Sequence, residues 1–116
     1  QPDKHVNGKL TMGENIGDLG GLNFAYDALQ AADAGTEDPM IDGLTRDQRF
    51  FLSWARVWRG NIRDKAQLVL LNTDPHSPAK FRAIGAPSNM PAFAAAFDCK
   101  PGDAMVRGED QRIVIW

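Results

Sequence analysis

Glu14 and Asp18 are the first residues whose types and spacing could do chemistry. They lie four positions apart in the stretch 13–22, GENIGDLGGL. On a helix this spacing puts both carboxylates on one face, about 40° apart around the axis. Like charges so placed repel, and each glycine costs a helix interior up to ~1 kcal/mol against alanine. Such a segment needs support from a cation between the carboxylates or from a backbone packed against the glycines. The alternative is a solvated acidic helix start, favoured by the helix dipole.

A second informative stretch is 74–78, DPHSP. The two prolines restrict the backbone around His76, and Asp74 can accept a hydrogen bond from one ring nitrogen and leave the other for a substrate. Arg82 follows on the segment that this turn begins. A positioned histidine and arginine could together hold an oxyanion or a carbonyl oxygen. The alternatives are a turn histidine bonded to a backbone carbonyl and an arginine in a surface ion pair.

Helices must position these side chains, and the pattern predicts a mainly helical chain. A first helix should begin at Thr11 or Gly13 and run to about Ala34, with Gly35 as its C-terminal cap. A second should begin after Thr45, which forms a capping box with the glutamine three residues on, and should stop at 60–61. Its aromatic residues predict a broad, deeply packed apolar face.

The second half of the chain predicts shorter helices. One should span 63–71, although its apolar run 68–71 could also form a strand. Ser77 should cap the next helix, with Pro78 in its first position, and that helix should end near residue 85. Ser88 or Asn89 should cap a further short helix. The last four residues should form a strand or a packed extended tail.

Composition limits the function. At 116 residues the chain is at most one domain, its net charge is -2, and no basic stripe indicates nucleic acid. No apolar run reaches the length of a membrane span. Because the chain begins with Gln1 and has no signal peptide, we expect a fragment or a processed product, with any membrane attachment through absent N-terminal segments.

Taken together, the motifs resemble the C-terminal end of the neprilysin and endothelin-converting-enzyme family of zinc metallopeptidases. The resemblance covers nearly the whole chain in colinear order, and its two specific motifs are E-N-I-x-D and D-x-H-S-P, about 60 residues apart. The residues that carry it are Asn7-Gly8, Gly13-Glu14-Asn15-Ile16, Asp18, Gly20-Gly21-Leu22, Ala25-Tyr26, Phe50-Phe51, Ala55, Val57-Trp58, Asp74, His76-Ser77-Pro78, Phe81-Arg82, Gly85, Asn89, Phe93 and Trp116.

The resemblance implies a role for each site residue. Glu14 corresponds to the third protein ligand of a catalytic zinc, and Asp18 to the carboxylate that orients a zinc-binding histidine. His76 corresponds to the side chain that stabilises the oxyanion of the tetrahedral intermediate, with Asp74 orienting it. Two further residues correspond to substrate contacts: Arg82 to the group that holds a substrate carbonyl, and Trp58 to an aromatic wall of the pocket for the residue after the cleaved bond.

Two departures qualify the resemblance. The family motif usually has alanine at the position of Gly17, a change that weakens the helix and removes no ligand. Secreted animal members carry several cysteines here, whereas this chain has only Cys99. The difference indicates a bacterial-type member that folds without disulfides. Separately, we expect a location outside the cytoplasm (periplasmic, secreted or membrane-anchored), with a cytoplasmic location as the alternative.

The family's H-E-x-x-H segment, which supplies two zinc ligands and the general base, is not in this sequence. Residues 1–116 should therefore be the C-terminal part of a zincin-like catalytic domain, mainly α with little or no β. The parent should be a zinc endopeptidase that cleaves oligopeptides, and this part should be inactive and bind no zinc at the family site. It needs the upstream remainder of the catalytic domain as its partner. The alternative is a non-catalytic helical binding module of the same fold. We further expect His76 and Arg82 to face the same cleft.

Overall fold

The computed structural model describes residues 4–115 and is helical, as predicted. The described residues contain no β-strand, only an isolated bridge between Ile41 and Leu44. The elements in chain order are α1 (Gly8–Ala32), α2 (Arg46–Val57), α3 (Asp64–Thr73), α4 (Ala79–Gly85), the 3₁₀ helix η1 (Pro87–Asn89) and α5 (Pro91–Ala96). Residues 68–71 lie within α3, so the strand alternative for this run is wrong.

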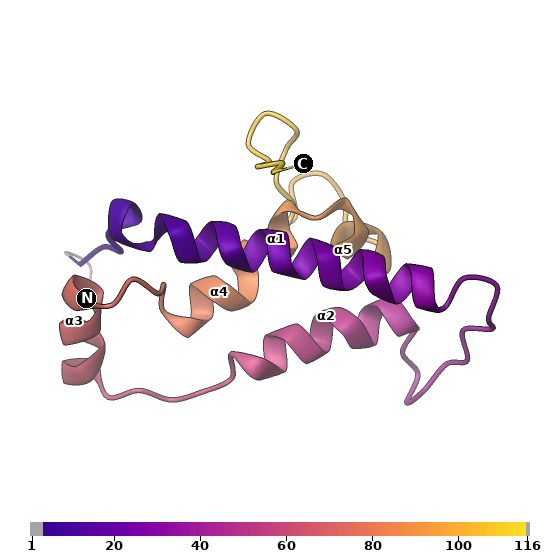
Figure 1. Ribbon diagram of the computed structural model, residues 1–116, viewed down its shortest axis with the longest axis horizontal. Helices are drawn as coiled ribbons and strands as arrows, with labels where there is room; N and C mark the ends of the chain where they lie inside the picture. Colours follow the sequence, from indigo (N-terminus) through magenta and orange to yellow (C-terminus); the bar gives the residue numbers. More distant parts are fainter. Residues whose placement is uncertain (1–3, 116) are drawn as a thin grey trace.

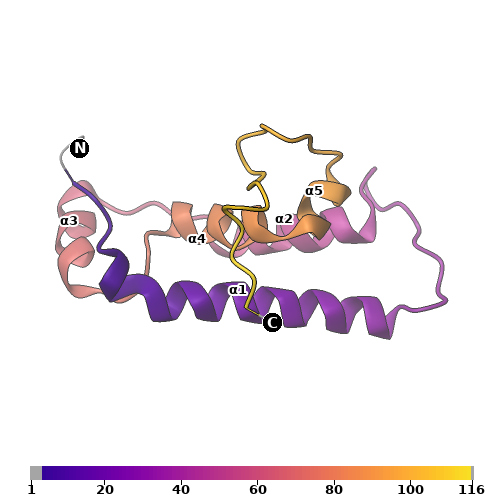
Figure 2. The same ribbon diagram turned by 90° about the horizontal axis from the view of Figure 1, so that it is seen from above.

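The long helix α1 forms one layer, and α2, α4 and α5 form the other (Figures 1 and 2). The chain turns back after α1, so that α2 runs in the opposite direction, and α4 returns between them with α3 at one end of the molecule (Figure 1). Contacts of α1 with α4 and η1 join the two layers, and contacts of α2 with α4 and α5 hold the second layer together. The small core between them consists of Leu19, Leu22, Phe51, Ala86 and Met90.

Helix α1 begins earlier than predicted, at Gly8 instead of Thr11 or Gly13. The side chain of Asn7 accepts hydrogen bonds from the backbone N–H groups of Lys9 and Leu10 and so caps the helix. The helix also ends earlier, at Ala32. Gly35, which was expected to cap it, lies in the following turn with a φ of +79°. Because α1 begins so early, Glu14 lies beyond its first turn, and the dipole-stabilised helix start is not what the structure shows.

Helix α2 has the predicted capping box but a narrower buried face than expected. The Thr45 hydroxyl accepts from the Gln48 backbone N–H, and the Gln48 side chain accepts from the Thr45 backbone N–H. Gln48 also donates to the carbonyl oxygen of Ala96, at 2.9 Å, which links α2 to α5. Only Phe51 of the helix is buried, and Val57, at the helix end, is 70% exposed. The prediction of a broad, deeply packed face on α2 is therefore wrong at the position of Val57.

The phenol of Tyr26 connects α1 to α2 by donating to Asp47 at 2.8 Å. Burial and this bond to a carboxylate raise the pKa of Tyr26 from 10.0 to about 12. The neutral phenol is favoured in the folded state, so its contribution to stability is present below pH 10 and is lost as the pH rises towards 12.

Tyr26 is the only tyrosine in the chain. Ultraviolet titration of the isolated chain should give a midpoint near 12, and Asp47→Asn should lower it. A midpoint near 10 would mean that the two helices do not pack in solution.

Two predicted helix caps have other functions. The Ser77 hydroxyl donates to Asn15 on α1, and Pro78 occupies the N-cap position of α4 instead of its first helical position. The Asn89 side chain donates to the carbonyl oxygen of Gly85 and accepts from the backbone N–H of Ile113. Neither Ser88 nor Asn89 caps α5, whose N-cap position is taken by Met90. Ser77 therefore bonds to a distant helix, and Asn89 bonds both to the end of α4 and to the C-terminal segment.

The bond between Asn89 and Ile113 holds the C-terminal segment against the helices. Residues 113–115 form no strand, so of the two predicted alternatives the extended tail is correct within the described residues, and Trp116 lies outside them. Ile115 packs against the core. None of the described helices is long and apolar enough to cross a membrane.

Candidate functional site

Two acidic residues of α1, Glu14 and Asp18, face the segment 74–82, about 60 residues further along the chain. Glu14 contacts His76, and Asp18 contacts Arg82. The helical spacing therefore puts both carboxylates on one face, as predicted. The glycine explanation for this stretch is wrong at Gly13, Gly17 and Gly21, where a Cβ would meet no described atom within 4 Å. Charged partners from the later segment support this part of α1.

His76 lies between two carboxylates. Its Nδ1 is 2.7 Å from Oδ1 of Asp74, and its Nε2 is 3.2 Å from Oε2 of Glu14. The Nδ1 contact with Asp74 is a hydrogen bond, and the Nε2 contact with Glu14 is at ion-pair distance. The side chains of His76 and Glu14 are 44% and 43% exposed, so both remain accessible to a bound molecule. The contact with Asp74 is the orienting contact that the sequence predicts.

Asp74 also fixes the backbone of this turn. Its Oδ1 accepts from the His76 backbone N–H at 2.9 Å. This bond and the bond from the His76 ring lower the pKa of Asp74 from its ordinary value of 3.8. The charged form is favoured in the folded state, so its contribution to stability is present above about pH 3.8 and is lost as the pH falls through the lowered pKa. The turn is therefore held throughout the neutral range.

Arg82 is held on three sides. Its Nε and Nη2 donate to the two oxygens of Asp18, at 2.7 and 2.6 Å. Its guanidinium lies over the ring of Trp58, with Cζ 3.9 Å from the ring centre, and its carbonyl oxygen accepts from the indole of Trp54. The bond to Asp18 raises the pKa of Arg82. The side chains of Arg82 and Asp18 are only 14% and 11% exposed, so the alternative interpretation of Arg82 as part of a surface ion pair is wrong.

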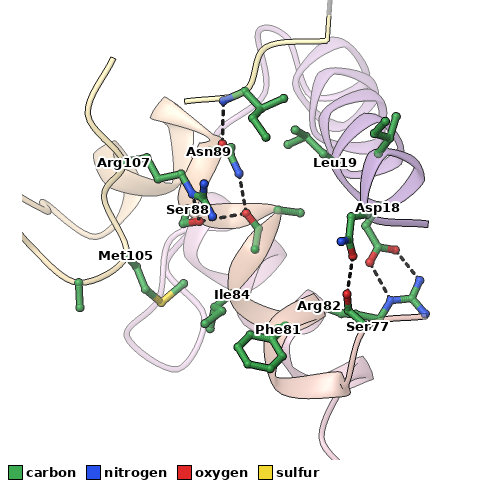
Figure 3. Close-up of a pocket in the computed structure, with 16 residues that line it drawn as sticks. Asp18, Leu19, Ser77, Phe81, Arg82, Ile84, Ser88, Asn89, Met105 and Arg107 are labelled. Carbon is green, nitrogen blue, oxygen red and sulfur yellow. Dashed lines mark hydrogen bonds and ion pairs between the residues drawn. The ribbon is translucent and has the colours of Figure 1, made fainter. Parts of the chain in front are cut away.

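A cavity of about 360 Å³ lies beside the Asp18–Arg82 pair, between α1, α4 and the C-terminal segment (Figure 3). In Figure 3 the Arg82 side chain reaches across to Asp18, while Phe81 and Ile84 line the α4 side. A second cavity, of about 240 Å³, is lined by His76 and Asp74. His76 and Arg82 each line a different one of these two cavities, and the expectation that both face one cleft of the parent enzyme stays a prediction. Ser77 lines both.

Trp58 lines neither of these two cavities. Its ring is occupied by Arg82, and its buried indole nitrogen has no hydrogen-bond partner within residues 4–115. A buried donor without an acceptor is costly and uncommon. The structure thus shows Trp58 as a support for Arg82 and does not show a substrate pocket against it.

The donor set for a metal is incomplete in this chain. Within the described residues no group of three or more His, Cys, Asp or Glu side chains could hold a metal ion. The half-exposed carboxylate of Glu14 fits one position of a zinc site, since its only described polar partner is His76. A site with three protein ligands would need the other two from outside residues 4–115.

Sequence reasoning missed three residues that position the site. Asn15 and Ser77 bond to one another at 2.8 Å, and Trp54 holds the backbone of Arg82. The sequence shows Asn15 only as part of a motif, predicts Ser77 as a helix cap, and offers Trp54 only as one of the aromatic residues of the second helix. A usable signal was their place in the chain, since Asn15 and Ser77 each directly follow a candidate site residue.

The chain was compared with known proteins. The family model described as Peptidase family M13 matches residues 1–113. Neprilysin-3 of Drosophila melanogaster is 45% identical over 104 residues, which cover 86% of this chain and 13% of that protein. Endothelin-converting enzyme 1 of Bos taurus is 47% identical over 103 residues, or 86% of this chain and 14% of that protein.

A solved structure has the same fold over nearly the whole chain. It is the cryo-electron microscopy structure of the Mycobacterium tuberculosis zinc metalloprotease Zmp1 in the open state, with a TM-score of 0.92 and 46% sequence identity. The match covers 97% of this chain and 17% of that one. The chain thus spans between 13% and 17% of the length of these proteins. By sequence and by structure, it belongs to peptidase family M13.

Proposed function

We propose that this chain is the C-terminal part of the catalytic domain of a zinc-dependent endopeptidase that hydrolyses oligopeptides. The observation that carries the proposal is the contact between Glu14 on α1 and His76, which brings a candidate zinc ligand and a candidate oxyanion donor to one point from distant segments. Membership of peptidase family M13 supports the same activity.

Glu14 is the residue that would bind the zinc, together with two ligands from the rest of the parent protein. When bound, zinc polarises a carbonyl group and lowers the pKa of its water. Asp18 would orient one of the zinc-binding histidines. An ionised carboxylate offers about four acceptor sites, and Arg82 uses two of those on Asp18, so the remainder can accept from a histidine.

The other residues would act on the substrate. Asp74 holds the His76 ring through Nδ1, which leaves Nε2, the nitrogen that faces Glu14, to donate to the developing oxyanion. Arg82 would hold a substrate carbonyl through Nη1, because its Nε and Nη2 are used by Asp18. Trp58 would form a wall of the pocket for the residue after the cleaved bond, and its ring supports the Arg82 guanidinium that lies over it.

The isolated chain should be inactive, since it contributes one zinc ligand where a catalytic site needs three. Its partners would be peptide substrates and the upstream remainder of the catalytic domain. We propose a bacterial parent and a location outside the cytoplasm, with a cytoplasmic location as the alternative.

The test compares the full-length parent with the isolated 116-residue chain. Metal analysis after dialysis should give one zinc per full-length molecule and none per isolated chain. Only the full-length protein should cleave a short fluorogenic peptide, and a chelator should abolish that cleavage. A full-length protein that binds no zinc and cleaves no peptide would favour a non-catalytic helical binding module. Stoichiometric zinc on the isolated chain, held by Glu14 and two of its own side chains, would contradict the assigned ligand set.

A further inference from the structure

A run of hydrogen bonds joins the His76 turn to α1. The Ser77 hydroxyl donates to Oδ1 of Asn15 at 2.8 Å, and Nδ2 of Asn15 donates to the Thr11 hydroxyl at 3.3 Å. Thr11 donates in turn to the carbonyl oxygen of Asn7 at 3.2 Å. Every donor in this run points the same way, and bonds so arranged polarise and strengthen one another. Ser77 and Thr11, at 7% and 3% exposed, are buried.

This run begins beside the candidate catalytic residues. Asn15 directly follows Glu14 on α1, and Ser77 directly follows His76 on the turn. The Ser77 hydroxyl is not used to cap α4, which has no side-chain cap. It bonds instead to a residue 62 positions earlier, at the point where Glu14 and His76 meet.

The Glu14–His76 contact cannot hold its own geometry, because both side chains are more than 40% exposed and exposed ion pairs are weak. The Asp18–Arg82 pair is well buried, but it fixes α4, six residues beyond His76. The bond between Asn15 and Ser77 is the part-buried link nearest to the contact, and its Ser77 end is buried. Since productive geometry needs reacting groups held within about 0.5 Å, such a link is required there.

We infer that Asn15 and Ser77 are positioning residues that set the separation of His76 from Glu14. The inference rests on the proposed function, because it gives the bond a role in the reaction of that site. Loss of the bond would free the His76 turn. The Asp18–Arg82 pair would still hold α4, and Glu14 would still bind zinc.

The experiment uses the full-length parent with Ser77→Ala, Asn15→Ala and the double variant. Ser53→Ala is the matched control, because the Ser53 hydroxyl is exposed and donates only to Arg49 in its own helix. Rates are expressed per bound zinc. Each single variant should lower kcat by about 10- to 100-fold, the effect of a displacement of order 1 Å, with KM and zinc content close to the wild type. The double variant should be no worse than Asn15→Ala, because all three variants remove the Asn15–Ser77 bond and Asn15→Ala already removes the bond to Thr11 as well.

Several outcomes would overturn the inference. Single variants with the kcat of Ser53→Ala, or losses that multiply in the double variant, would each contradict a shared positioning bond. If Ser77→Ala does not fold, Asn15→Ala still decides, because residue 15 is exposed and alanine favours the helix. Glu14→Val in the same series tests the proposed function itself. If it retains zinc and activity, the function is wrong, whereas if it loses both and the Asn15 and Ser77 variants match the control, only the positioning role is wrong.

Discussion

Glu14→Val in the full-length parent should remove bound zinc and peptidase activity together. Valine has no oxygen to offer a metal, and the two ligands left from the rest of the protein would not complete a catalytic site. The Glu14 side chain is 43% exposed and forms an ion-pair contact with the half-exposed His76, so the fold should survive the change. Valine is a weaker helix former than glutamate, at a cost below ~1 kcal/mol. Metal analysis after dialysis and peptide-cleavage kinetics measure the two effects.

The control for this variant is Asp27→Val, which also replaces an exposed acid on α1 by valine. Asp27 lies near Tyr26, away from the Glu14–His76 contact, so zinc content and kcat should stay at wild-type values. A Glu14→Val protein with a full zinc complement would refute the ligand assignment. Loss of zinc in the Asp27→Val protein would show that any valine on α1 disturbs the site.

His76→Ala should leave zinc in place and reduce kcat on the order of 10²- to 10³-fold. A donor that acts on the developing oxyanion is worth about 3–4 kcal/mol in the transition state, and little of that is present in the ground state. The side chain is 44% exposed, so its removal leaves no closed cavity. The backbone N–H of residue 76 still donates to Asp74, which keeps the turn closed. Steady-state kinetics, with zinc content measured on the same preparation, separate kcat from metal loss.

His5→Ala is the matched control, since His5 is the other histidine of the chain, is exposed and should not affect the reaction. If His76→Ala lost zinc while Glu14→Val kept it, the two roles would be reversed. Wild-type kinetics for both variants would remove the peptidase interpretation of this site. Arg82→Met is a poorer probe, because it leaves Asp18 buried and unpaired at a cost of about 3 kcal/mol in stability, which mixes folding with binding.

Local sequence determined most of the helical content of this protein. Thr45 and Gln48 form a capping box whose partners are three residues apart, so the start of α2 could be predicted from the pair itself. The spacing of Glu14 and Asp18 determined that both carboxylates share one face, because the angle between two positions of a helix depends only on the number of residues that separate them. Asp74 and His76, two positions apart, determined their own contact in the same way.

Tertiary structure decided how the polar side chains of the later segments are used. Ser77 and Asn89 are good helix caps by composition, but each bonds to a distant residue, Asn15 or Ile113. A cap is a local option, and a buried hydroxyl or amide adopts whichever partner the packing brings within reach. The sequence contains no signal for that choice.

Partner choice for the charges was decided in the same way. The family resemblance of the motifs predicts that Glu14, Asp18, His76 and Arg82 belong to one site. Which carboxylate meets which basic side chain depends on how α4 lies against α1, and this packing pairs Asp18 with Arg82 and Glu14 with His76. It also puts His76 and Arg82 in separate cavities. The attraction between opposite charges depends on their separation and not on which residues carry them. The three-dimensional packing therefore selects the pairs, because it sets the separations.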